Sequence, residues 1–385
     1  MAEVTNYIDR LVAELCPDGV EYRPLGELLG YEQPTKYLVS SKDYDDSYPT
    51  PVLTAGKTFI LGYTNETEGI YPASKEEPVI IFDDFTTAFK WVEFPFKAKS
   101  SAMKMLTLKS GNNSLFKYVY YAMQCIVYNS SDHARQWISK YSNIEVPVPP
   151  LEIQEAIVEI LDKFTNLEAE LEAELEARTL QHEYYRDSLF EALDCPRVPL
   201  GSFTQYSKDR KRDDSTVSVY VGVENLKSDF QGCAPTESTN PGVVFQKGDI
   251  LLGNIRPYLK KMWRADSDGV ASPDVLVIRI RDEFSEKISS RYLYHLLASN
   301  EFVGYNVAHS RGGKMPRGNK AKILEFEAPI PSLEEQQRIV DILDRFDALT
   351  ASLSEGLPAE LAARRSQYEY YRDQLLTFPR KGENQ

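Results

Sequence analysis

Two long stretches of the chain repeat apolar residues at intervals of three and four positions. In a helix such positions lie on one face, so the pattern predicts two helices that each carry one apolar stripe. The first stripe comprises Ile157, Ile160, Leu161, Phe164, Leu167, Leu171 and Leu175, and the second comprises Ile339, Ile342, Leu343, Phe346, Leu349 and Leu353. Each helix would run for about 40 residues, or about 60 Å.

The two stretches are copies of one another. Residues 145–167 and 327–349 are identical at 13 of 23 positions, and residues 174–190 and 360–376 at 11 of 17. The offset between the copies grows from 182 to 186, so the second copy holds four extra residues around 354–357. Gly356 and Pro358 stand at this insertion, and because proline removes a helical hydrogen bond we expect a kink or break there.

A helix of this length needs a partner along its apolar face. The other copy is the most economical partner, because its stripe is also apolar and has a matching length. We therefore expect an antiparallel coiled coil that relates two like units by a pseudo-twofold axis. The alternative is that each stripe docks on the globule of its own unit.

A four-residue module is iterated in the middle of the first helix. Residues 167–178 read LEAELEAELEAR. Adding or removing one module would lengthen or shorten a helix by about 6 Å and rotate it by about 40°. Steps of three, four and four residues favour a straight or slightly right-handed pair of helices.

The helical segments divide the chain into four parts. Residues 1–143 and 195–325 form two globules, and residues 144–194 and 326–385 form the helical segments. Both globules show short apolar runs between turn residues, which indicates an α+β fold. Strands are predicted at 52–55, 79–82 and 103–108 and at 217–223, 250–252 and 275–280, with helices near 115–128 and 291–298.

The globules share only a few features. Both open with Pro-Leu-Gly, and both place Tyr-x-Tyr on the late helix, at Tyr118 and Tyr120 and at Tyr292 and Tyr294. Elsewhere they diverge. Matching helices with differing globules are what an adaptor would show if its helices hold constant partners and its globules recognise two different targets.

Charge is unevenly distributed along the chain. The net charge of −14 argues at first against a nucleic-acid partner, because such proteins are usually basic. However, residues 144–194 hold 14 acidic against 3 basic residues, whereas residues 195–325 hold 20 basic against 15 acidic residues. The acidic excess therefore belongs mainly to the first helix.

Basic residues in loop-like segments are the candidate DNA-binding residues, because Lys and Arg neutralise phosphates and Arg can read base edges. The second globule offers Lys208, Arg210, Lys211, Arg212, Arg256, Tyr258, Lys260, Lys261, Arg264, Arg311, Lys314, Arg317 and Lys320. The first offers Lys57, Lys90, Lys97, Lys99, Lys104 and Arg135. A solvated basic face is the alternative for each cluster taken alone.

No catalytic constellation is visible in the sequence. Residues 56–58 resemble the end of a phosphate-binding loop, but Pro51 stands where its first glycine is required. No nuclease motif, glycine-rich cofactor turn or amino-methyltransferase segment is found. We therefore expect a protein that is not itself an enzyme and holds no cofactor.

Cysteines and histidines are too scattered to predict a metal site. The cysteines, which we expect to be free thiols, are Cys16, Cys125, Cys195 and Cys233, and the histidines, which we expect to be structural, are His133, His182, His295 and His309. No apolar run is long enough for a membrane span, and no signal-peptide pattern opens the chain. We expect a cytoplasmic protein.

The repeated motifs resemble those of a known family. The helix starts VPVPPLEIQEAIVEILDKF and APIPSLEEQQRIVDILDRF, the later HEYYRDSL and YEYYRDQL, and KGDIL at residues 247–251 are similar to the specificity subunit of type I restriction-modification systems. The resemblance covers nearly the whole chain. One departure is Ile153, whose counterpart in the second copy is Glu335, so the two helix starts differ in charge.

The resemblance implies a function and a set of partners. Two target-recognition domains, held apart by two antiparallel helices, would each read half of a split site in double-stranded DNA. The helices would also dock two modification (methyltransferase) subunits that carry S-adenosylmethionine, and restriction (motor) subunits that use ATP and Mg²⁺ would join them. Residues 144–194 and 326–380 would be the spacer and docking helices.

Two alternatives to this function stay open. The chain could be a non-catalytic scaffold whose globules bind proteins, or the recognition subunit of another restriction class with the same architecture. The acidic first helix agrees with the family, since partner subunits can supply much of the positive surface of a DNA clamp. The target bases cannot be read from the sequence, because base readout depends on a few side chains in loops.

Overall fold

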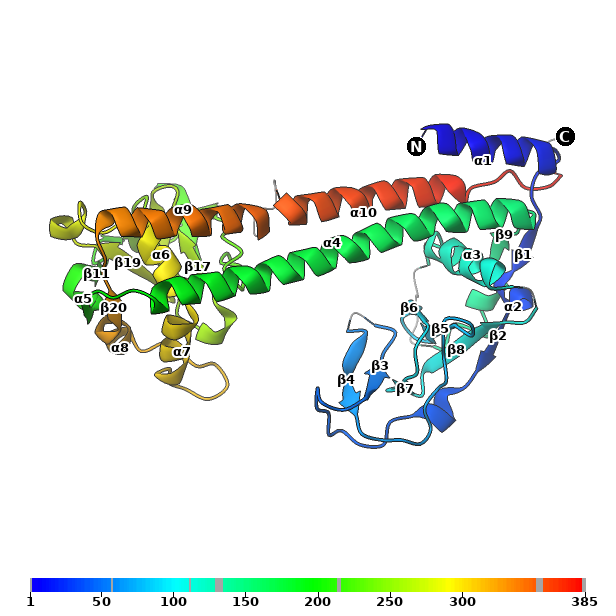
Figure 1. Ribbon diagram of the computed structural model, residues 1–385, viewed down its shortest axis with the longest axis horizontal. Coiled ribbons are helices and arrows are strands. Elements are labelled where there is room, and N and C mark those ends of the chain that lie inside the picture. The colour runs from blue at the N-terminus through cyan, green and yellow to red at the C-terminus, as the bar shows by residue number, and fades with distance from the viewer. Residues whose placement is uncertain are drawn as a thin grey trace. The chain divides into compact units, whose positions relative to one another are not determined.

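The computed structural model describes residues 2–56, 58–110, 112–128, 134–212, 216–350 and 356–382. The chain divides into two compact units, residues 1–169 with 363–385 (unit 1) and residues 170–362 (unit 2). Each unit contains one globule and parts of the long helices, as Figure 1 shows.

Unit 1 begins with helix α1 (Ala2–Leu15) and continues into a mixed globule. The elements of this globule are β1 (Tyr22–Pro24), α2 (Leu25–Leu28), β2 (Leu29–Glu32), η1 (Pro34–Tyr37), β3 (Thr50–Leu53), β4 (Ile60–Thr64), β5 (Val79–Asp83), β6 (Phe89–Val92), β7 (Lys97–Ala98), β8 (Met103–Leu108), α3 (Asn113–Gln124), η2 (Tyr141–Asn143) and β9 (Glu145–Pro147). The predicted strand 103–108 matches β8, whereas the predicted helix 115–128 is shorter and ends at Gln124.

Unit 2 holds the second globule. Its elements are β10 (Arg197–Pro199), α5 (Leu200–Phe203), β11 (Thr204–Tyr206), β12 (Arg210–Lys211), β13 (Ser218–Val221), β14 (Thr236–Ser238), β15 (Gly242–Phe245), β16 (Ile250–Gly253), η3 (Pro257–Leu259), β17 (Met262–Arg264), β18 (Gly269–Ala271), β19 (Val275–Ile280), η4 (Asp282–Phe284), α6 (Ser290–Ala298), α7 (Asn300–Ala308), α8 (Lys320–Glu325) and β20 (Glu327–Pro329). The predicted strand 275–280 matches β19.

The two globules share one sheet topology. The antiparallel sheet β2-β8-β5-β6 of unit 1 recurs in unit 2 as β11-β19-β16-β17. In the second sheet of unit 1, β3 pairs antiparallel with β4 and parallel with β7, and in unit 2 β13 pairs in the same way with β14 and β18. Unit 2 extends that sheet by β15 and β12. The duplication seen in the helices therefore includes the globules, although their sequences have diverged.

The long helix α4 (Leu151–Glu191) spans 41 residues without a glycine or proline. Its start is fixed by a glutamine in the Pro-Leu-Glu-x-Gln motif: buried Gln154 donates from Nε2 to the carbonyl oxygen of Pro149 at 2.6 Å. Gln336 makes the same contact with Pro331 at 3.0 Å at the start of α9 (Leu333–Thr350). The motif is therefore a helix-start signal, because the glutamine satisfies a carbonyl group of the proline segment.

The second helical segment consists of two helices. Helix α9 ends at Thr350 and α10 (Gly356–Leu375) begins at Gly356, with Pro358 in its first turn. A proline is tolerated in a first turn because the missing N–H would have no helical partner there. Residues 351–355, including Leu353, lie outside the described part of the chain.

Each helical stripe begins inside the core of its own globule. In unit 1, Ile157 and Leu161 pack with Phe116 and Val119 of α3 and with the sheet residue Leu106. In unit 2, Ile339 and Leu343 pack with the equivalent helix α6 and sheet β16–β19. The first turns of each helix therefore dock on their own globule, which is the alternative to helix pairing that the sequence left open.

Further along the stripes, helices pair with helices in antiparallel directions. In unit 1 the ring of Phe164 stacks 5.8 Å from that of Tyr371, and Glu168 binds Arg365 at 2.6 Å, so a later α4 residue meets an earlier α10 residue. In unit 2, His182 stacks 5.7 Å from Phe346, whereas the later Phe190 lies in the core with Ile339. The remaining stripe residues are partly covered: Ile160, Ile342, Leu171 and Leu175 are half-buried, and Leu167 and Leu349 are exposed.

Candidate nucleic-acid interface

Two basic segments of the second globule come together although more than 50 residues separate them in the sequence. The backbone N–H of Arg256 donates to Pro316 at 2.7 Å, and that of Gly318 donates to Asn254 at 3.0 Å. Arg311 and Arg317 close a small hairpin through two backbone hydrogen bonds of 2.8 Å. The loops around η3 and residues 311–318 therefore form one surface, which we call the basic loop pair.

The basic loop pair exposes several cations and one aromatic ring. Its exposed side chains include those of Tyr258, Arg311, Lys314 and Arg317, and exposed Lys320 follows at the start of α8. Arg317 is also 3.3 Å from Asp274, which fixes its guanidinium near the surface. This combination of cations beside an aromatic ring suits a nucleic-acid backbone and its bases.

The backbone on both sides of η3 is in an unusual conformation. Arg256 and Lys260 have φ values of 53° and 51°, in the left-handed region that residues with a Cβ rarely occupy. The Nε atom of Arg256 is buried and makes no hydrogen bond within the described residues. Strained backbone of this kind gathers at binding sites, where surrounding contacts hold it.

Three candidate DNA-binding residues near this loop make contacts within the unit and do not project into solvent. Lys260 lies 3.4 Å from Glu183 of α4, Lys261 donates to the carbonyl oxygen of Val223 at 2.8 Å, and Arg264 donates to Ser290 at 2.9 Å. All three side chains are half-buried. Their contacts support the shape of the basic loop pair.

The cluster at residues 208–212 lies on a sheet edge. Strand β12 is one of the two edge strands of the five-stranded sheet, and Lys208, Arg210 and Arg212 on or beside it are exposed. Lys211 turns back to the carbonyl oxygen of Thr216 and to Ser218. Charged residues on an edge strand also prevent pairing with other chains, so this cluster has a structural explanation too.

In the first globule, the prediction of DNA binding is wrong for two lysines. Lys97 is 4% exposed and binds Glu66 at 2.6 Å, and Lys104 is 1% exposed and binds Asp84 at 3.0 Å. A buried, paired ammonium group cannot reach a phosphate. The error arose because the sequence shows the lysines without the distant carboxylates that neutralise them.

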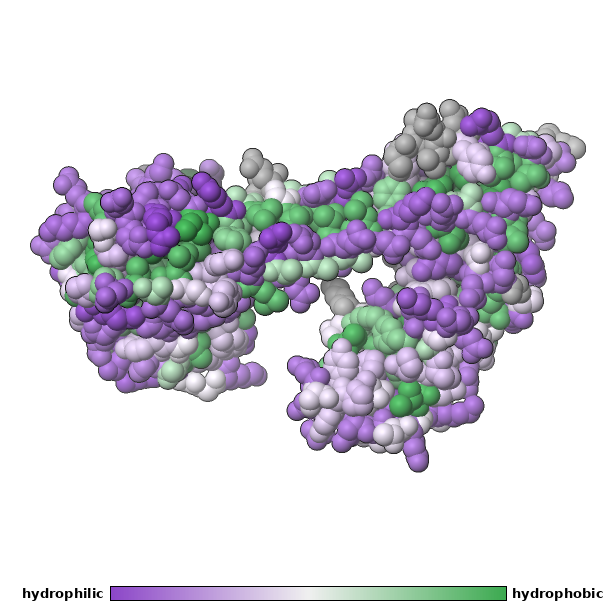
Figure 2. All heavy atoms as spheres, viewed as in Figure 1, coloured by the Kyte–Doolittle hydropathy of each residue, from purple (hydrophilic) through white to green (hydrophobic). Residues whose placement is uncertain are grey.

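The remaining candidate DNA-binding residues of the first globule differ in how exposed they are. Lys99 is half-buried and donates to the hydroxyl group of Tyr44 at 2.7 Å. Lys90 and Arg135 are exposed, and Lys57 lies outside the described residues. Figure 2 shows hydrophilic residues over much of the visible face of each globule and hydrophobic residues along parts of the long helices.

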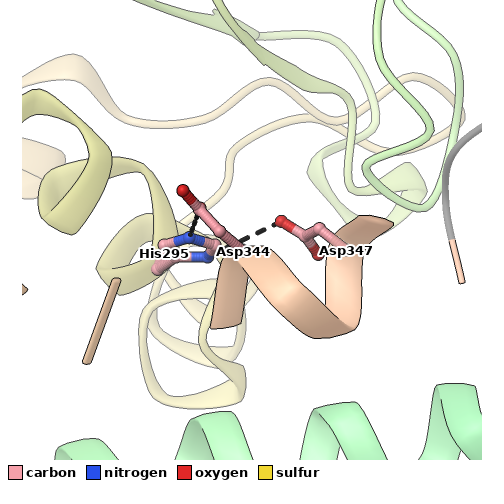
Figure 3. Close-up of side chains that lie close together, drawn as sticks. All are labelled: His295, Asp344 and Asp347. Atoms are coloured by element: carbon pink, nitrogen blue, oxygen red, sulfur yellow. Dashed lines mark hydrogen bonds and ion pairs between the residues drawn. The ribbon is translucent and has the colours of Figure 1, made fainter. Parts of the chain in front are cut away.

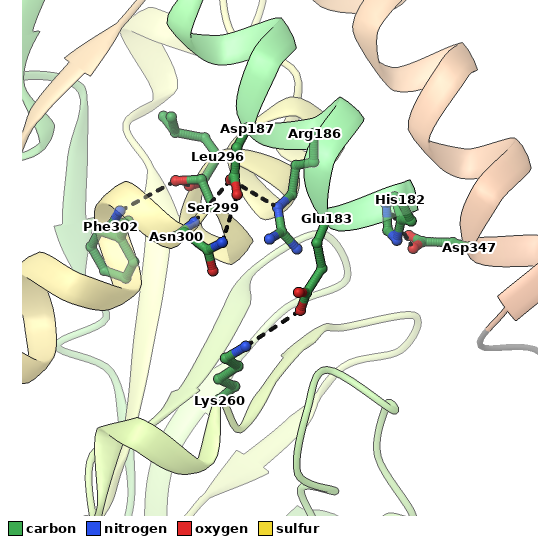
Figure 4. Close-up of polar contacts among 10 residues, drawn as sticks. All are labelled: His182, Glu183, Arg186, Asp187, Lys260, Leu296, Ser299, Asn300, Phe302 and Asp347. Atoms are coloured by element: carbon green, nitrogen blue, oxygen red, sulfur yellow. Dashed lines mark hydrogen bonds and ion pairs between the residues drawn. The ribbon is translucent and has the colours of Figure 1, made fainter. Parts of the chain in front are cut away.

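Sequence reasoning missed a polar cluster that forms where three helices of unit 2 meet. It consists of His182 on α4, His295 on α6, and Asp344 and Asp347 on α9, and we call it the histidine–aspartate cluster (Figures 3 and 4). His295 Nε2 lies 2.8 Å from Asp344 Oδ1, and its Nδ1 lies 3.9 Å from Asp347 Oδ2. His182 Nε2 lies 3.5 Å from Asp347 Oδ1.

The environment of this cluster shifts the pKa values of three members. Burial, with the nearby charges of Arg186 and His295, lowers the pKa of His182 to about 4. Burial raises the pKa of Asp347, although His295 acts against the change. Burial also opposes ionisation of Asp344, but His295 and Arg291 hold its pKa below the usual value.

The expectation of isolated structural histidines is therefore corrected for two of them. His182 and His295 share one cluster, whereas His309 contacts the carbonyl oxygen of Tyr305 at 2.8 Å, and His133 lies outside the described residues. The only local signal was the spacing of Asp344 and Asp347, which places both carboxylates on one helix face. The four cysteines are free, as expected, and they are partly buried.

Two globules of one topology, each packed against a long helix of duplicated sequence, define a protein built from two like domains. The family model of the type I restriction modification DNA specificity domain matches residues 17–177 and 204–363. The chain belongs to this family.

Relatives along the whole chain agree with this membership. The chain is 43% identical to the specificity subunit of the type I restriction enzyme EcoR124I/EcoR124II of Escherichia coli, over 97% of this chain and 98% of that protein. It is 28% identical to a putative type I restriction enzyme specificity subunit of Haemophilus influenzae, over 93% of this chain and 96% of the relative.

Solved structures agree on the fold. The S subunit of a type I restriction-modification system from M. genitalium matches with a TM-score of 0.53 at 14% identity, over 93% of this chain and 96% of that one. A chain from a study of complex assembly in the type I R-M system matches with a TM-score of 0.56 at 16% identity, over 93% and 97%. In the described part of the chain, no helix is both long and apolar enough to cross a membrane.

Proposed function

We propose that this chain is the DNA-specificity subunit of a type I restriction-modification complex and that each globule reads one half of a bipartite DNA site. The observation that carries the proposal is the duplication: two sheets of the same topology support loops of different sequence and charge. A shared frame with unlike loops is suited to reading two unlike half-sites.

The basic loop pair is the proposed contact surface of the second globule. Its exposed arginines can bind phosphates and can also form bidentate hydrogen bonds with guanine. The first globule retains Lys90 and Arg135 as exposed candidates. It relies less on cations than the second globule does, because two of its lysines are committed to buried ion pairs.

The helices are the proposed spacer and the docking surface for partners. Tyr184 and Tyr370 occupy equivalent positions in the two Glu-Tyr-Tyr-Arg-Asp segments and are 69% and 59% exposed. Large exposed aromatic residues are typical anchors of protein interfaces. Two equivalent surfaces suit two copies of one partner, which we infer to be the modification subunits.

Catalysis is assigned to the partners. Modification subunits would hold S-adenosylmethionine, and restriction subunits would use ATP and Mg²⁺, so this chain would act without a catalytic residue of its own. The complex would work on DNA in the cytoplasm. This assignment rests on family membership and on the absence of a catalytic motif in the sequence.

Methylome sequencing of a host that carries this gene and its neighbours tests the proposal. We expect methylation at two short defined half-sites separated by a fixed gap of unread bases. Binding of the assembled complex to random duplex DNA should also weaken steeply with salt, because phosphate contacts release counterions. An unmodified genome together with salt-independent binding would favour the protein scaffold instead.

A further inference from the structure

We propose that the histidine–aspartate cluster binds one divalent transition-metal ion through His182, His295 and Asp347, with Asp344 orienting His295. The three proposed ligands come from α4, α6 and α9, so a bound ion would tie the second globule to its two long helices within unit 2 (Figures 3 and 4).

The distances between the donor atoms suit a small ion. Zinc-type bonds of about 2.0–2.1 Å in a tetrahedral site place neighbouring donor atoms about 3.4 Å apart. His182 Nε2 and Asp347 Oδ1 are separated by 3.5 Å, and His295 Nδ1 and Asp347 Oδ2 by 3.9 Å. The ligand atoms of His295, Asp344 and Asp347 all lie within 4.8 Å of one another, whereas His182 approaches this group through Asp347, so ion binding would require His182 Nε2 and His295 Nδ1 to move towards each other.

Asp344 acts on the opposite side of the His295 ring. Its Oδ1 lies 2.8 Å from Nε2, which leaves Nδ1 directed to Asp347. Metal-bound histidines commonly have their second ring nitrogen bonded to a carboxylate in this way, which fixes the tautomer and ring orientation. Arg291 binds Oδ2 of Asp344 at 2.6 Å and holds this carboxylate in place.

His182 presents a nitrogen without a hydrogen-bond partner to the same cavity. Its Nε2 is fully buried and makes no hydrogen bond within the described residues. His182, His295 and Asp347 all line a cavity of about 250 Å³. A buried polar nitrogen without a hydrogen-bond partner costs free energy, and coordination to a metal ion would offset this cost.

The charges around the cluster favour a nitrogen-preferring metal. Arg186, Arg264 and Arg291 face the cavities beside the cluster and oppose a cation, but Arg291 is neutralised by Asp344, and Arg186 contacts Asp187 at 3.4 Å. Two imidazoles and one carboxylate are the proposed donors. Imidazole suits Zn²⁺, Co²⁺ and Ni²⁺ better than Mg²⁺ or Ca²⁺, which prefer oxygen.

Unit 1 contains the same arrangement without the ligands. Lys117 and Asp162 stand where unit 2 has Arg291 and Asp344, and they also pair, at 3.7 Å. The three ligand positions His295, Asp347 and His182 are filled in unit 1 by Tyr121, Thr165 and Tyr368.

The contacts confirm this correspondence. Tyr121 donates to Asp162 and lies 3.5 Å from Thr165, and Tyr368 packs on Phe164 as His182 packs on Phe346. The second copy therefore differs from the first at all three proposed ligands and keeps the acidic–basic pair beside them.

Cobalt titration of the metal-free full-length chain tests the proposal. We expect one equivalent of Co²⁺ to bind, with the visible absorption of a nitrogen–oxygen site. Asp344→Asn, which removes the supporting carboxylate, should weaken binding by about 10- to 100-fold, and His182→Gln and Asp347→Asn should weaken it more. The matched unit 1 variants Tyr368→Gln and Thr165→Asn should leave the affinity unchanged.

Several outcomes would overturn the proposal. These are binding of less than one equivalent, equal affinity in His182→Gln and wild type, or a sulfur-to-cobalt charge-transfer band that would indicate the free cysteines. If the unit 2 variants fail to fold, X-ray absorption spectroscopy of the cobalt-loaded wild type tests the ligand set instead. It should count two imidazole ligands, and none or one would refute the site. The triple variant Tyr121→His, Thr165→Asp, Tyr368→His should gain a second equivalent.

Discussion

The two globules share one sheet topology but place different side chains at equivalent interior positions of that sheet. In unit 1, Lys104 of β8 and Asp84, directly after β5, form a buried ion pair. The pairing of β16 with β19 places Leu276 and Asn254 at the corresponding positions of unit 2. A charged pair in one copy is therefore an apolar residue and a neutral amide in the other.

This difference shows which features the duplicated frame requires. Strand order, strand direction and the contact of the late helix with a long helix are kept, because backbone pairing and apolar burial depend on pattern more than on residue identity. Interior charged groups can be replaced together, because removing both members of a buried ion pair leaves no uncompensated charge. Loops outside the sheets are then free to diverge, as two different DNA half-sites require.

The largest effect is expected from breaking the buried pair of unit 1. Lys104→Leu leaves the carboxylate of Asp84 buried without its cation, which should lower the free energy of unfolding by about 3–5 kcal/mol. Urea unfolding followed by circular dichroism measures this loss.

A second substitution sharpens the same comparison. Adding Asp84→Asn to Lys104→Leu copies the residues of unit 2 and should recover most of the lost stability, because the amide oxygen can still accept from the backbone N–H of Trp137. A double variant as unstable as the single variant would show that the two sheets are not interchangeable at this position.

The next largest effect is a loss of DNA affinity when exposed cations of unit 2 are removed. Arg311→Ala and Arg317→Ala should each weaken DNA binding by about 1–3 kcal/mol if the side chain reads a base, and should lower the salt dependence if it binds a phosphate. Fluorescence anisotropy of the assembled complex at several salt concentrations measures both.

The matched control for these arginine variants is Lys75→Ala, an exposed cation of unit 1 beside two glutamates. We expect no change in affinity or in salt dependence. A similar loss in this variant would mean that overall charge, and not the basic loop pair, sets the affinity.

Smaller and equal effects are expected from the two exposed tyrosines of the helices. Tyr184→Ala and Tyr370→Ala should each weaken one of the proposed modification-subunit sites by at least about 1 kcal/mol, because aromatic anchors dominate such interfaces. Native mass spectrometry should show complexes with one modification subunit missing. Val127→Ala, at a highly exposed apolar residue of the first globule, serves as the control, and unequal effects of the two tyrosines would contradict equivalent docking.

The smallest change in affinity is expected from the spacer. Deleting residues 171–174, one four-residue module of α4, shortens the helix by about 6 Å, which corresponds to between one and two base pairs. Methylome sequencing should show a shorter gap with both half-sites unchanged. An altered half-site beside an unaltered gap would contradict the spacer role.

The sequence predicted the features that depend on local pattern. The apolar period located α4 and α9, the alignment of the two copies placed the insertion beside Gly356, where α10 begins, and the apolar runs 103–108 and 275–280 matched β8 and β19. These elements are predictable because residues a few positions apart determine which face of a helix or strand is apolar.

Only the tertiary structure decided which charged residues face solvent and which lie inside. Lys104 and Arg317 look alike in the sequence, but one lies in a buried ion pair and the other on an exposed hairpin. The two basic loops and the histidine–aspartate cluster are likewise assembled from segments tens of residues apart. Burial and pairing depend on these long-range contacts, so the sequence determined the repeated frame, and the folded chain determined the chemistry at each site.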